Sequence, residues 1–292
     1  MRLGILLGGS GLFIRDWESG FAFAKDAGYS CVELAAVDAT GGWPGADLGK
    51  CGSAAEAIAV ADAARAHGLE VSACQCHVEY LQAAGAELRK LVEHTSRMMD
   101  CAAAAGIPLV HTVTGPPAEA DPWPILAELY AELLSHAAGL DGAVQLAVEP
   151  VFAYCVGNLA TTERLLADVG DDRLGINFDP SHFPYHDESP LPFIRRFAGR
   201  IVHAHLKDAV VRPGAGDGPN TFAMSDGREF AFTAPGDGQI EFPEILSALR
   251  QAGYDGVVSL ELGHGVPDPA DAARRCVPFA QDAAARSGVL LT

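Results

Sequence analysis

The stretch Leu174-Gly-Ile-Asn-Phe-Asp179-Pro-Ser-His182 predicts a buried β-strand that ends in polar side chains. The strand stops at Pro180, because proline has no N–H group with which to continue a ladder of hydrogen bonds. Asp179 is therefore the last strand residue, and His182 lies in the loop that follows. Asp-Pro-Ser is also ordinary turn chemistry, so this stretch alone does not establish a site for a metal or a polar ligand.

Seven further segments have the same character, an apolar strand followed by a helical segment. The predicted strands begin near residues 2, 30, 69, 107, 143, 173, 200 and 256. Glycine or proline stands at most of the joints, and no linker divides the chain. Eight alternations of strand and helix predict a single (β/α)8 TIM barrel over residues 1–292. An open doubly wound sheet is the main alternative, and it requires a different closure of the chain.

The segment 207–240 interrupts the regular spacing of strands and helices. It contains six glycines and shows no clear periodicity. A segment of this length without periodicity is typical of an active-site lid or of disorder. We therefore expect a lid-like loop over the carboxyl ends of the barrel strands. Within it, the backbone of Gly236-Asp-Gly238 could form a nest for an anion.

The composition limits the partners and the compartment. The 38 Asp and Glu residues against 20 Lys and Arg residues give a formal net charge of −18. So acidic a surface repels phosphodiester backbones and anionic lipid, and we expect no nucleic-acid partner and no membrane partner. Seven scattered cysteines without a CxxC pair favour reduced thiols. With no signal peptide evident, a cytoplasmic protein is expected, and a homo-oligomer is left open.

Acidic or imidazole side chains stand at the ends of four consecutive strands, the fifth to the eighth. They are Glu149, Asp179, His205 and Glu261. The carboxyl ends of the strands form the mouth of such a barrel, so these side chains are expected to converge there. Three crowded carboxylates repel one another, and a divalent cation resolves that repulsion. Three carboxylates and one imidazole suit Mn²⁺ best, with Mg²⁺, Co²⁺ and Zn²⁺ as alternatives.

These motifs resemble the xylose-isomerase-like superfamily of sugar phosphate isomerases and epimerases. The resemblance rests on five segments: Leu-Ala-Val-Glu149-Pro, Asn-Phe-Asp179-Pro-Ser-His182, His-Ala-His205-Leu-Lys-Asp208, Gly-Asp-Gly238-Gln-Ile-Glu-Phe and Val-Ser-Leu-Glu261. It implies that Glu149, Asp179, His205 and Glu261 bind one divalent metal ion. It also implies that Glu149 and Glu261 are the catalytic proton donor and acceptor, and that His182 contacts the substrate.

Two further residues of the seventh strand, His203 and Lys207, share a strand face with His205. The ligand role goes to His205 rather than His203, because the family pattern is a histidine followed three residues later by an acid, here Asp208. Lys207 has the same strand parity as His205, so its ammonium can reach the mouth. There it could hydrogen-bond a substrate hydroxyl or carbonyl, or pair with a carboxylate.

His77 and His111 lie on the third and fourth strands and keep one other function open. Apurinic endonucleases of the same superfamily bind several metals through additional histidines. The nuclease relatives carry an Asp-x-His motif after strand seven, whereas this chain has no histidine between Lys207 and Ile240. We therefore expect His77 and His111 to line the substrate pocket or to be polar packing. Aromatic residues of the mouth loops could stack on a sugar ring or cap the core: Trp43, Phe183 and Tyr185.

The predicted function is that of a divalent-metal-dependent sugar isomerase or epimerase. It would remove the proton next to the carbonyl of a ketose, sugar or polyol-derived ketone, through a metal-bound cis-enediolate. A lyase or dehydratase acting on a keto-sugar is the alternative, because it begins by abstracting the same proton. A phosphodiesterase like the apurinic endonucleases and a barrel that only binds sugar are further alternatives. No convincing phosphate-binding cluster is present, which favours an unphosphorylated substrate.

Overall fold

The computed structural model describes residues 1–8, 17–35, 54–118, 120–218, 220–263 and 266–292. Eight parallel strands close into a barrel in the order β1, β11, β7, β6, β5, β4, β3, β2 and back to β1. They are β1 Arg2–Leu7, β2 Cys31–Ala35, β3 Glu70–Cys76, β4 Leu109–Thr112, β5 Gln145–Val148, β6 Gly175–Phe178, β7 Ile201–Leu206 and β11 Val257–Leu260. The predicted (β/α)8 TIM barrel is confirmed.

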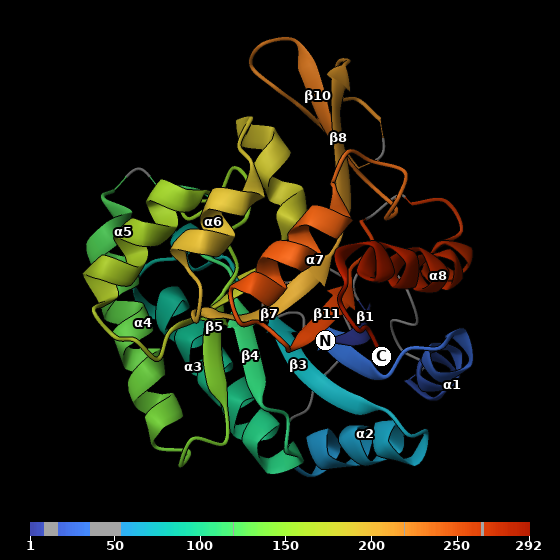
Figure 1. Cartoon of the computed structure of the whole chain (residues 1–292). Helices are drawn as coiled ribbons and strands as arrows, with labels where there is room; N and C mark the ends of the chain where they lie inside the picture. Colours follow the sequence, from blue (N-terminus) through green and yellow to red (C-terminus); the bar gives the residue numbers. More distant parts are fainter. Residues whose placement is uncertain (9–16, 36–53, 119, 219, 264–265) are drawn as a thin grey trace.

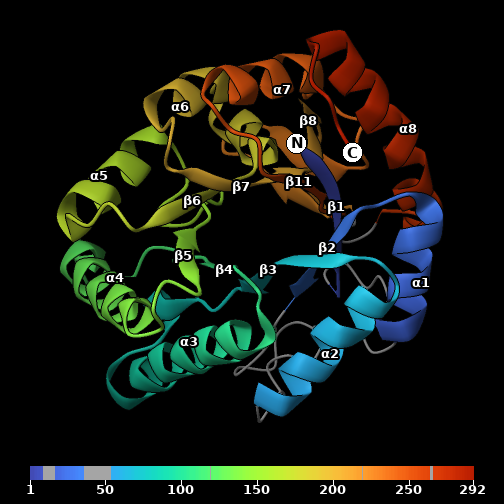
Figure 2. The ribbon, with the colours of Figure 1, turned by 60° about the horizontal axis from the view of Figure 1, so that its bottom comes forward.

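Helices surround the strands on the outside of the barrel, as Figure 2 shows. They are α1 Trp17–Ala27, α2 Ala54–Ala66, α3 Gly85–Ala105, α4 Pro122–Ala138, α5 Leu159–Val169, α6 Pro190–Arg196, α7 Phe242–Gln251 and α8 Pro269–Ser287, with the 3-10 helices η2 Tyr80–Gln82 and η3 Pro180–His186. Local capping chemistry sets some of these boundaries. At the start of α4 the Asp121 side chain accepts a hydrogen bond from the Trp123 N–H at 3.3 Å, and Pro122 opens the helix.

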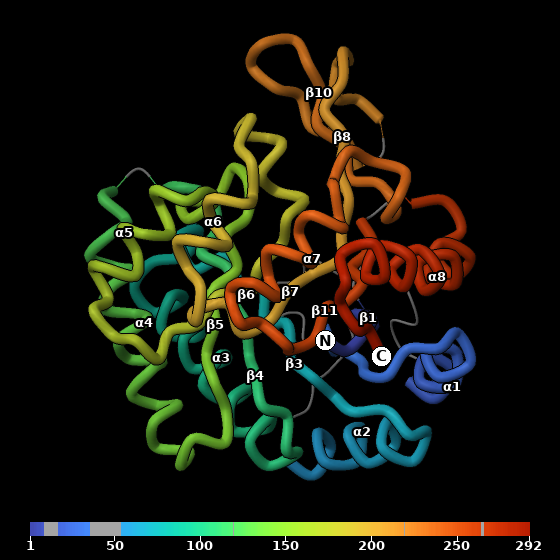
Figure 3. The backbone as a smooth tube through the Cα atoms, viewed as in Figure 1, coloured from blue at the N-terminus to red at the C-terminus, as the bar shows by residue number. Residues whose placement is uncertain are grey.

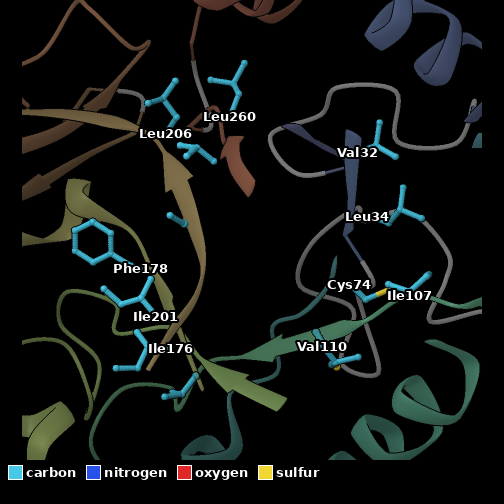
Figure 4. Packing of buried hydrophobic residues seen from close by; sticks show 14 of the residues in the cluster. Val32, Leu34, Cys74, Ile107, Val110, Ile176, Phe178, Ile201, Leu206 and Leu260 are labelled. Carbon is cyan, nitrogen blue, oxygen red and sulfur yellow. The ribbon is translucent and has the colours of Figure 1, made fainter. Parts of the chain in front are cut away.

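Successive side chains of a strand point to opposite faces of the sheet, so in this barrel they point alternately toward the surrounding helices and into the barrel interior. On β6, Ile176 and Phe178 belong to the large hydrophobic core, whereas Asn177 between them contacts polar groups of β4 and β7. On β2, Val32 and Leu34 belong to the same core. Figure 4 shows these four apolar side chains in their packing. The alternate positions of the strands are therefore free to carry polar side chains into the interior.

The barrel interior changes from apolar to polar toward the carboxyl ends of its strands. Ala73, Leu109 and Ala147 form a small apolar cluster of their own. Two residues further along β4 stands His111, and two residues beyond Ala147 stands Glu149. Because successive residues with the same parity form layers in such a barrel, the polar residues lie next to one another above the apolar layer.

The segment after β7 is not the irregular loop that the sequence predicts. It contains the strands β8 Asp208–Pro213, β9 Thr221–Ala223 and β10 Arg228–Thr233, which form an antiparallel sheet in the order β8, β10, β9. Figure 1 shows β8 and β10 extending beyond the barrel, and we call β8–β10 the projecting sheet. Its strands have three to six residues, too few to show a clear period between glycines. Its role as a lid stays a prediction.

The two ends of the chain lie side by side at the barrel, as Figure 3 shows. The Thr292 N–H donates to the Met1 carbonyl at 3.2 Å. Within the described ranges no helix combines the length and the apolar character needed to cross a membrane. Six cysteines are buried free thiols. Cys51 and Trp43 lie outside the described residues.

Candidate metal centre and active site

The four predicted metal ligands converge at the carboxyl ends of β5, β6, β7 and β11. Glu149 directly follows β5, Asp179 follows β6, His205 is the fifth residue of β7, and Glu261 directly follows β11. One ligand atom of each lies within 4.8 Å of the ligand atoms of the other three. The barrel therefore brings together four side chains that lie up to 112 residues apart in the sequence.

The candidate ligand atoms of these four residues face one another, and several of them lack a hydrogen-bond partner among the described residues. Nδ1 of His205 lies 2.8 Å from Oε2 of Glu261, 3.8 Å from Oε2 of Glu149 and 3.9 Å from Oδ2 of Asp179. Among the described residues, His205 Nδ1, Asp179 Oδ2 and Glu261 Oε2 are buried and have no hydrogen-bond partner. Buried polar atoms without partners are costly, and a shared cation satisfies all three. The residues present therefore fit a hard divalent metal.

Charged neighbours lower the pKa of two carboxylates of this site, those of Glu149 and Glu261. Burial would raise the pKa of Glu149, but His205 and His77 hold that pKa well below its usual range. Burial has the same tendency for Glu261, yet Lys207 and His205 lower its pKa to about 2. In turn, burial would lower the pKa of His205, but the surrounding carboxylates raise it well above its usual range. The carboxylates and the imidazole of this site therefore favour each other's charged forms.

His182 and Lys207, both predicted to bind substrate, flank the ligand group on two sides. Nε2 of His182 lies 3.2 Å from Oδ2 of Asp179 and 3.3 Å from Oε1 of Glu149. Nζ of Lys207 donates to Oε1 of Glu261 at 2.8 Å. Burial opposes the charge of both groups, but the adjacent carboxylates raise the pKa of each. Both side chains therefore place a nitrogen that can donate a hydrogen bond beside the metal ligands.

His77 and His111 occupy different levels of the site. His111 has no exposed surface, and its Nε2 lies 2.6 Å from Oε1 of Glu33. Nε2 of His77 lies 3.3 Å from Nδ1 of His111 and 3.3 Å from Oε2 of Glu149, and 24% of its side chain is exposed. His77 therefore borders the opening, whereas His111 lies in the buried layer beneath it. Their contact with substrate stays a prediction.

Two buried polar residues of the site were missed by the sequence analysis, Glu33 and Asn177. Glu33 is fully buried on β2 and contacts two histidines. Asn177 donates to Oε2 of Glu149 at 2.7 Å, and its Oδ1 lies 3.0 Å from Nδ1 of His203. A signal was available: each stands alone between apolar residues of a predicted strand, and a polar residue inside a buried strand needs a partner.

The projecting sheet reaches the site through aromatic side chains. The Lys207 ammonium lies 4.2 Å from the centroid of the Phe232 ring, and the His182 ring lies 5.6 Å from that ring. Phe152, which follows β5, packs against Phe230 and Tyr185 at 4.7 Å each. These rings form one wall beside the ligand group. Phe183, predicted to stack on substrate or to cap the core, packs in the core against Phe178 and Phe193.

A family model for the xylose isomerase-like TIM barrel matches residues 21–280. The chain therefore belongs to the xylose isomerase-like TIM-barrel family, as its motifs predict.

The known proteins similar to this chain include lyases and epimerases. Inosose dehydratase of Lacticaseibacillus casei is 30% identical over 137 residues, which are 45% of this chain and 45% of the relative. The chain thus matches less than half the length of that curated relative. D-Psicose 3-epimerase of Clostridium cellulolyticum H10 shares the fold with a TM-score of 0.72 and 15% identity, over 97% of this chain and 99% of that chain.

A second solved structure shares the fold. The IolI protein, whose crystal structure binds a zinc atom, has a TM-score of 0.69 and 18% identity over 99% of this chain and 98% of that chain. Together, the comparisons support an isomerase or epimerase only at the level of the superfamily. The sequence analysis left a lyase or dehydratase as the alternative activity. That alternative agrees with the name of the curated relative, an inosose dehydratase.

Proposed function

We propose that this chain is a divalent-metal-dependent enzyme that removes the proton next to the carbonyl group of a polyhydroxylated ketone. The observation that carries the proposal is the convergence of ligand atoms from Glu149, Asp179, His205 and Glu261 within 4.8 Å. Binding of a neutral sugar alone does not require three carboxylates at one mouth. A reaction that develops negative charge on the substrate does require a group that neutralises it.

The four converging residues would hold the metal. When bound there, a divalent ion stabilises negative charge on the carbonyl oxygen of the substrate as a Lewis acid. The carboxylates of Glu149 and Glu261 are the candidates for moving the carbon-bound proton. They follow β5 and β11, which are separated in the barrel by β6 and β7, so they approach the ligand group from different sides. Mn²⁺ as the particular metal is part of this proposal.

For the outcome of this step we favour dehydration of a cyclic keto-polyol of the inosose kind. The support is the segment of 30% identity to an inosose dehydratase. In such an elimination a glutamate takes the proton, the C–H electron pair forms the new C=C bond, and the β-hydroxyl leaves with a second proton. His182 is our candidate for that second donor, because its Nε2 lies between two carboxylates and an imidazolium gives up a proton more readily than an ammonium.

Epimerisation or isomerisation of a ketose is the second candidate. The observation that favours it is the placement of the two glutamates on strands separated by two others. An epimerase needs an acid or base on each face of the planar intermediate, whereas an elimination needs one base and one acid. The fold shared with D-psicose 3-epimerase is compatible with this outcome.

Incubation in D₂O with Mn²⁺ and either an inosose or a panel of ketoses tests both outcomes. Dehydration is expected to give a product that has lost one water, as seen by mass spectrometry. Epimerisation gives deuterium at carbon with inversion and no loss of water. Protein treated with a chelator is the control. Absence of both exchange and water loss with every ketone, in metal-loaded protein, would refute the proposed function.

A further inference from the structure

Glu33 lies fully buried in the interior of the barrel. The side chains that contact its carboxylate come from distant parts of the sequence. Its Oε1 lies 2.6 Å from Nε2 of His111, and both its oxygens lie 3.2 Å from Nε2 of His205. Removing a carboxylate from water is expensive unless donors replace the water. Two imidazole N–H groups, from β4 and β7, replace it here. The Glu33 carboxylate thus lies directly behind a residue of the proposed metal centre, His205.

The contact with Glu33 decides which nitrogen of His205 carries hydrogen. An ionised carboxylate only accepts hydrogen bonds, and an imidazole that binds a metal ion has given up the proton of its ligating nitrogen, so it keeps one N–H and one lone pair. Nε2 therefore carries the hydrogen, and Nδ1 keeps the lone pair. Nδ1 is the nitrogen that faces Glu261 at 2.8 Å, and it has no hydrogen-bond partner among the described residues.

We propose that Glu33 is a positioning residue of the metal centre: it orients the His205 ring and fixes the tautomer whose Nδ1 ligates the cation. A carboxylate behind a metal-binding histidine raises the basicity of the ligand and holds its ring in place. Glu33 itself touches neither the substrate nor the metal. This inference rests on the proposed metal centre.

The same carboxylate orders the histidine beside Glu149. With Nε2 of His111 donating to Glu33, Nδ1 of His111 is an acceptor, and it lies 3.3 Å from the donor Nδ2 of Asn177. That amide also donates to Glu149 at 2.7 Å. One buried carboxylate therefore sets the hydrogen-bond direction on two sides of the site.

A competing explanation is that Glu33, His111 and His205 hold a second ion of their own, since their ligand atoms also lie within 4.8 Å of one another. The contacts argue against it. The separation of 2.6 Å between Glu33 and His111 is that of a strong hydrogen bond, and none of the three side chains has exposed surface. Metal stoichiometry distinguishes the two explanations.

The first test compares Zn²⁺ affinity in the wild-type chain of residues 1–292, Glu33→Gln and Glu70→Gln by competition with a chromophoric chelator. The glutamine keeps the shape of Glu33, but its NH₂ group faces one imidazole N–H and displaces that ring. We expect Glu33→Gln to bind one Zn²⁺ per chain about tenfold to a hundredfold more weakly, with an unchanged circular dichroism spectrum. Glu70→Gln removes an exposed carboxylate of β3 and is expected to bind like the wild type.

The second test needs no variant at Glu33. In ¹⁵N-histidine-labelled wild type loaded with Zn²⁺, the His205 signals, identified by their loss in His205→Gln, should show hydrogen on Nε2 and metal on Nδ1. The opposite tautomer, unchanged affinity in Glu33→Gln, or loss of one of two bound ions in that variant would each overturn the positioning role. If Asp179→Ala and His205→Ala keep full Zn²⁺ affinity, the metal centre itself is wrong, which separates the two failures.

Discussion

The carboxylate of Asp208, at the start of β8, accepts a hydrogen bond from the backbone N–H of Gly238 at 3.0 Å. The N–H of Gly236 donates to the same oxygen at 2.9 Å, and that of Ile240 donates to the other oxygen at 3.1 Å. The first residue of the projecting sheet thus binds the backbone where the chain returns to the barrel. Gly236 and Gly238, which by sequence could form a nest for an anion, therefore bind a carboxylate of the protein itself.

We call the contact of the Asp208 carboxylate with the backbone N–H groups of Gly236, Gly238 and Ile240 the Asp208 clamp. This clamp predicts that Gly238→Ala destabilises the chain. A Cβ at position 238 would lie 2.2 Å from Oδ1 of Asp208 and 2.6 Å from the Ala209 carbonyl oxygen, so the clamp must open. We expect a loss of ~1–3 kcal/mol in the free energy of unfolding, because buried N–H groups lose their acceptor. Urea denaturation and limited proteolysis of segment 214–227 measure it. Asp217→Asn, at an exposed position in the same segment, is the control, and equal stability of both variants would contradict the clamp.

The metal centre predicts that Asp179→Ala and His205→Ala lose most of their bound metal. Each change removes one of four donors and leaves the remaining carboxylates without their shared counter-charge. Metal content after dialysis against Mn²⁺ and desalting is the measurement, with exposed Glu132→Gln as the control. Full occupancy in both variants would show that the ion binds elsewhere.

If Glu149 and Glu261 transfer protons as well as bind the metal, their conversion to glutamine should impair turnover more than metal binding. Glu149→Gln and Glu261→Gln should each lower turnover by about 10²–10⁴-fold, while the amide oxygen still supports part of the metal binding. For the epimerase outcome, deuterium exchange from each epimer of the substrate is the informative measurement. In a two-base enzyme, the loss of one glutamate stops exchange from one epimer only. Near-normal turnover in both variants would mean that the glutamates are ligands alone.

Phe232 predicts a contribution of the projecting sheet to substrate binding. Its ring lies 4.2 Å from the Lys207 ammonium, and Lys207 in turn binds Glu261. Phe232→Ala should raise KM more than it lowers kcat, because the ring borders the mouth without bearing an acid or base. Phe222→Ala, on the same sheet and 39% exposed, is the matched control. Identical kinetics in the two variants would remove Phe232 from the site.

The buried thiols predict resistance to alkylation. Burial raises the pKa of Cys76 and of Cys276 to about 12. Because the thiolate is the reactive form, neither residue should react with iodoacetamide at pH 8 in the folded chain, and both should react in denaturant. Peptide mass spectrometry measures the labelling. Labelling of both residues without denaturant would contradict the buried, protonated state.

The sequence by itself determined the barrel and indicated the members of the proposed metal centre. Strand periodicity, helix caps and breakers such as Pro180 are local signals, so they can be read without knowing which segments lie side by side. Asp179 was found because a proline ends its strand, and Glu149 because Pro150 ends the one before. Once eight strands are counted, the geometry of a closed barrel places their carboxyl ends around one mouth.

Only the tertiary structure decided how these residues are held. Glu33 and His205 are 172 residues apart, and no spacing in the chain indicates that they meet across the barrel. The direction of the His205 ring and the clamp between Asp208 and Gly238 likewise depend on which strands close beside one another. The strands of the projecting sheet are too short for a periodic signal and are stabilised by pairing. Lateral contacts between distant segments arise from packing, and a linear pattern does not contain them.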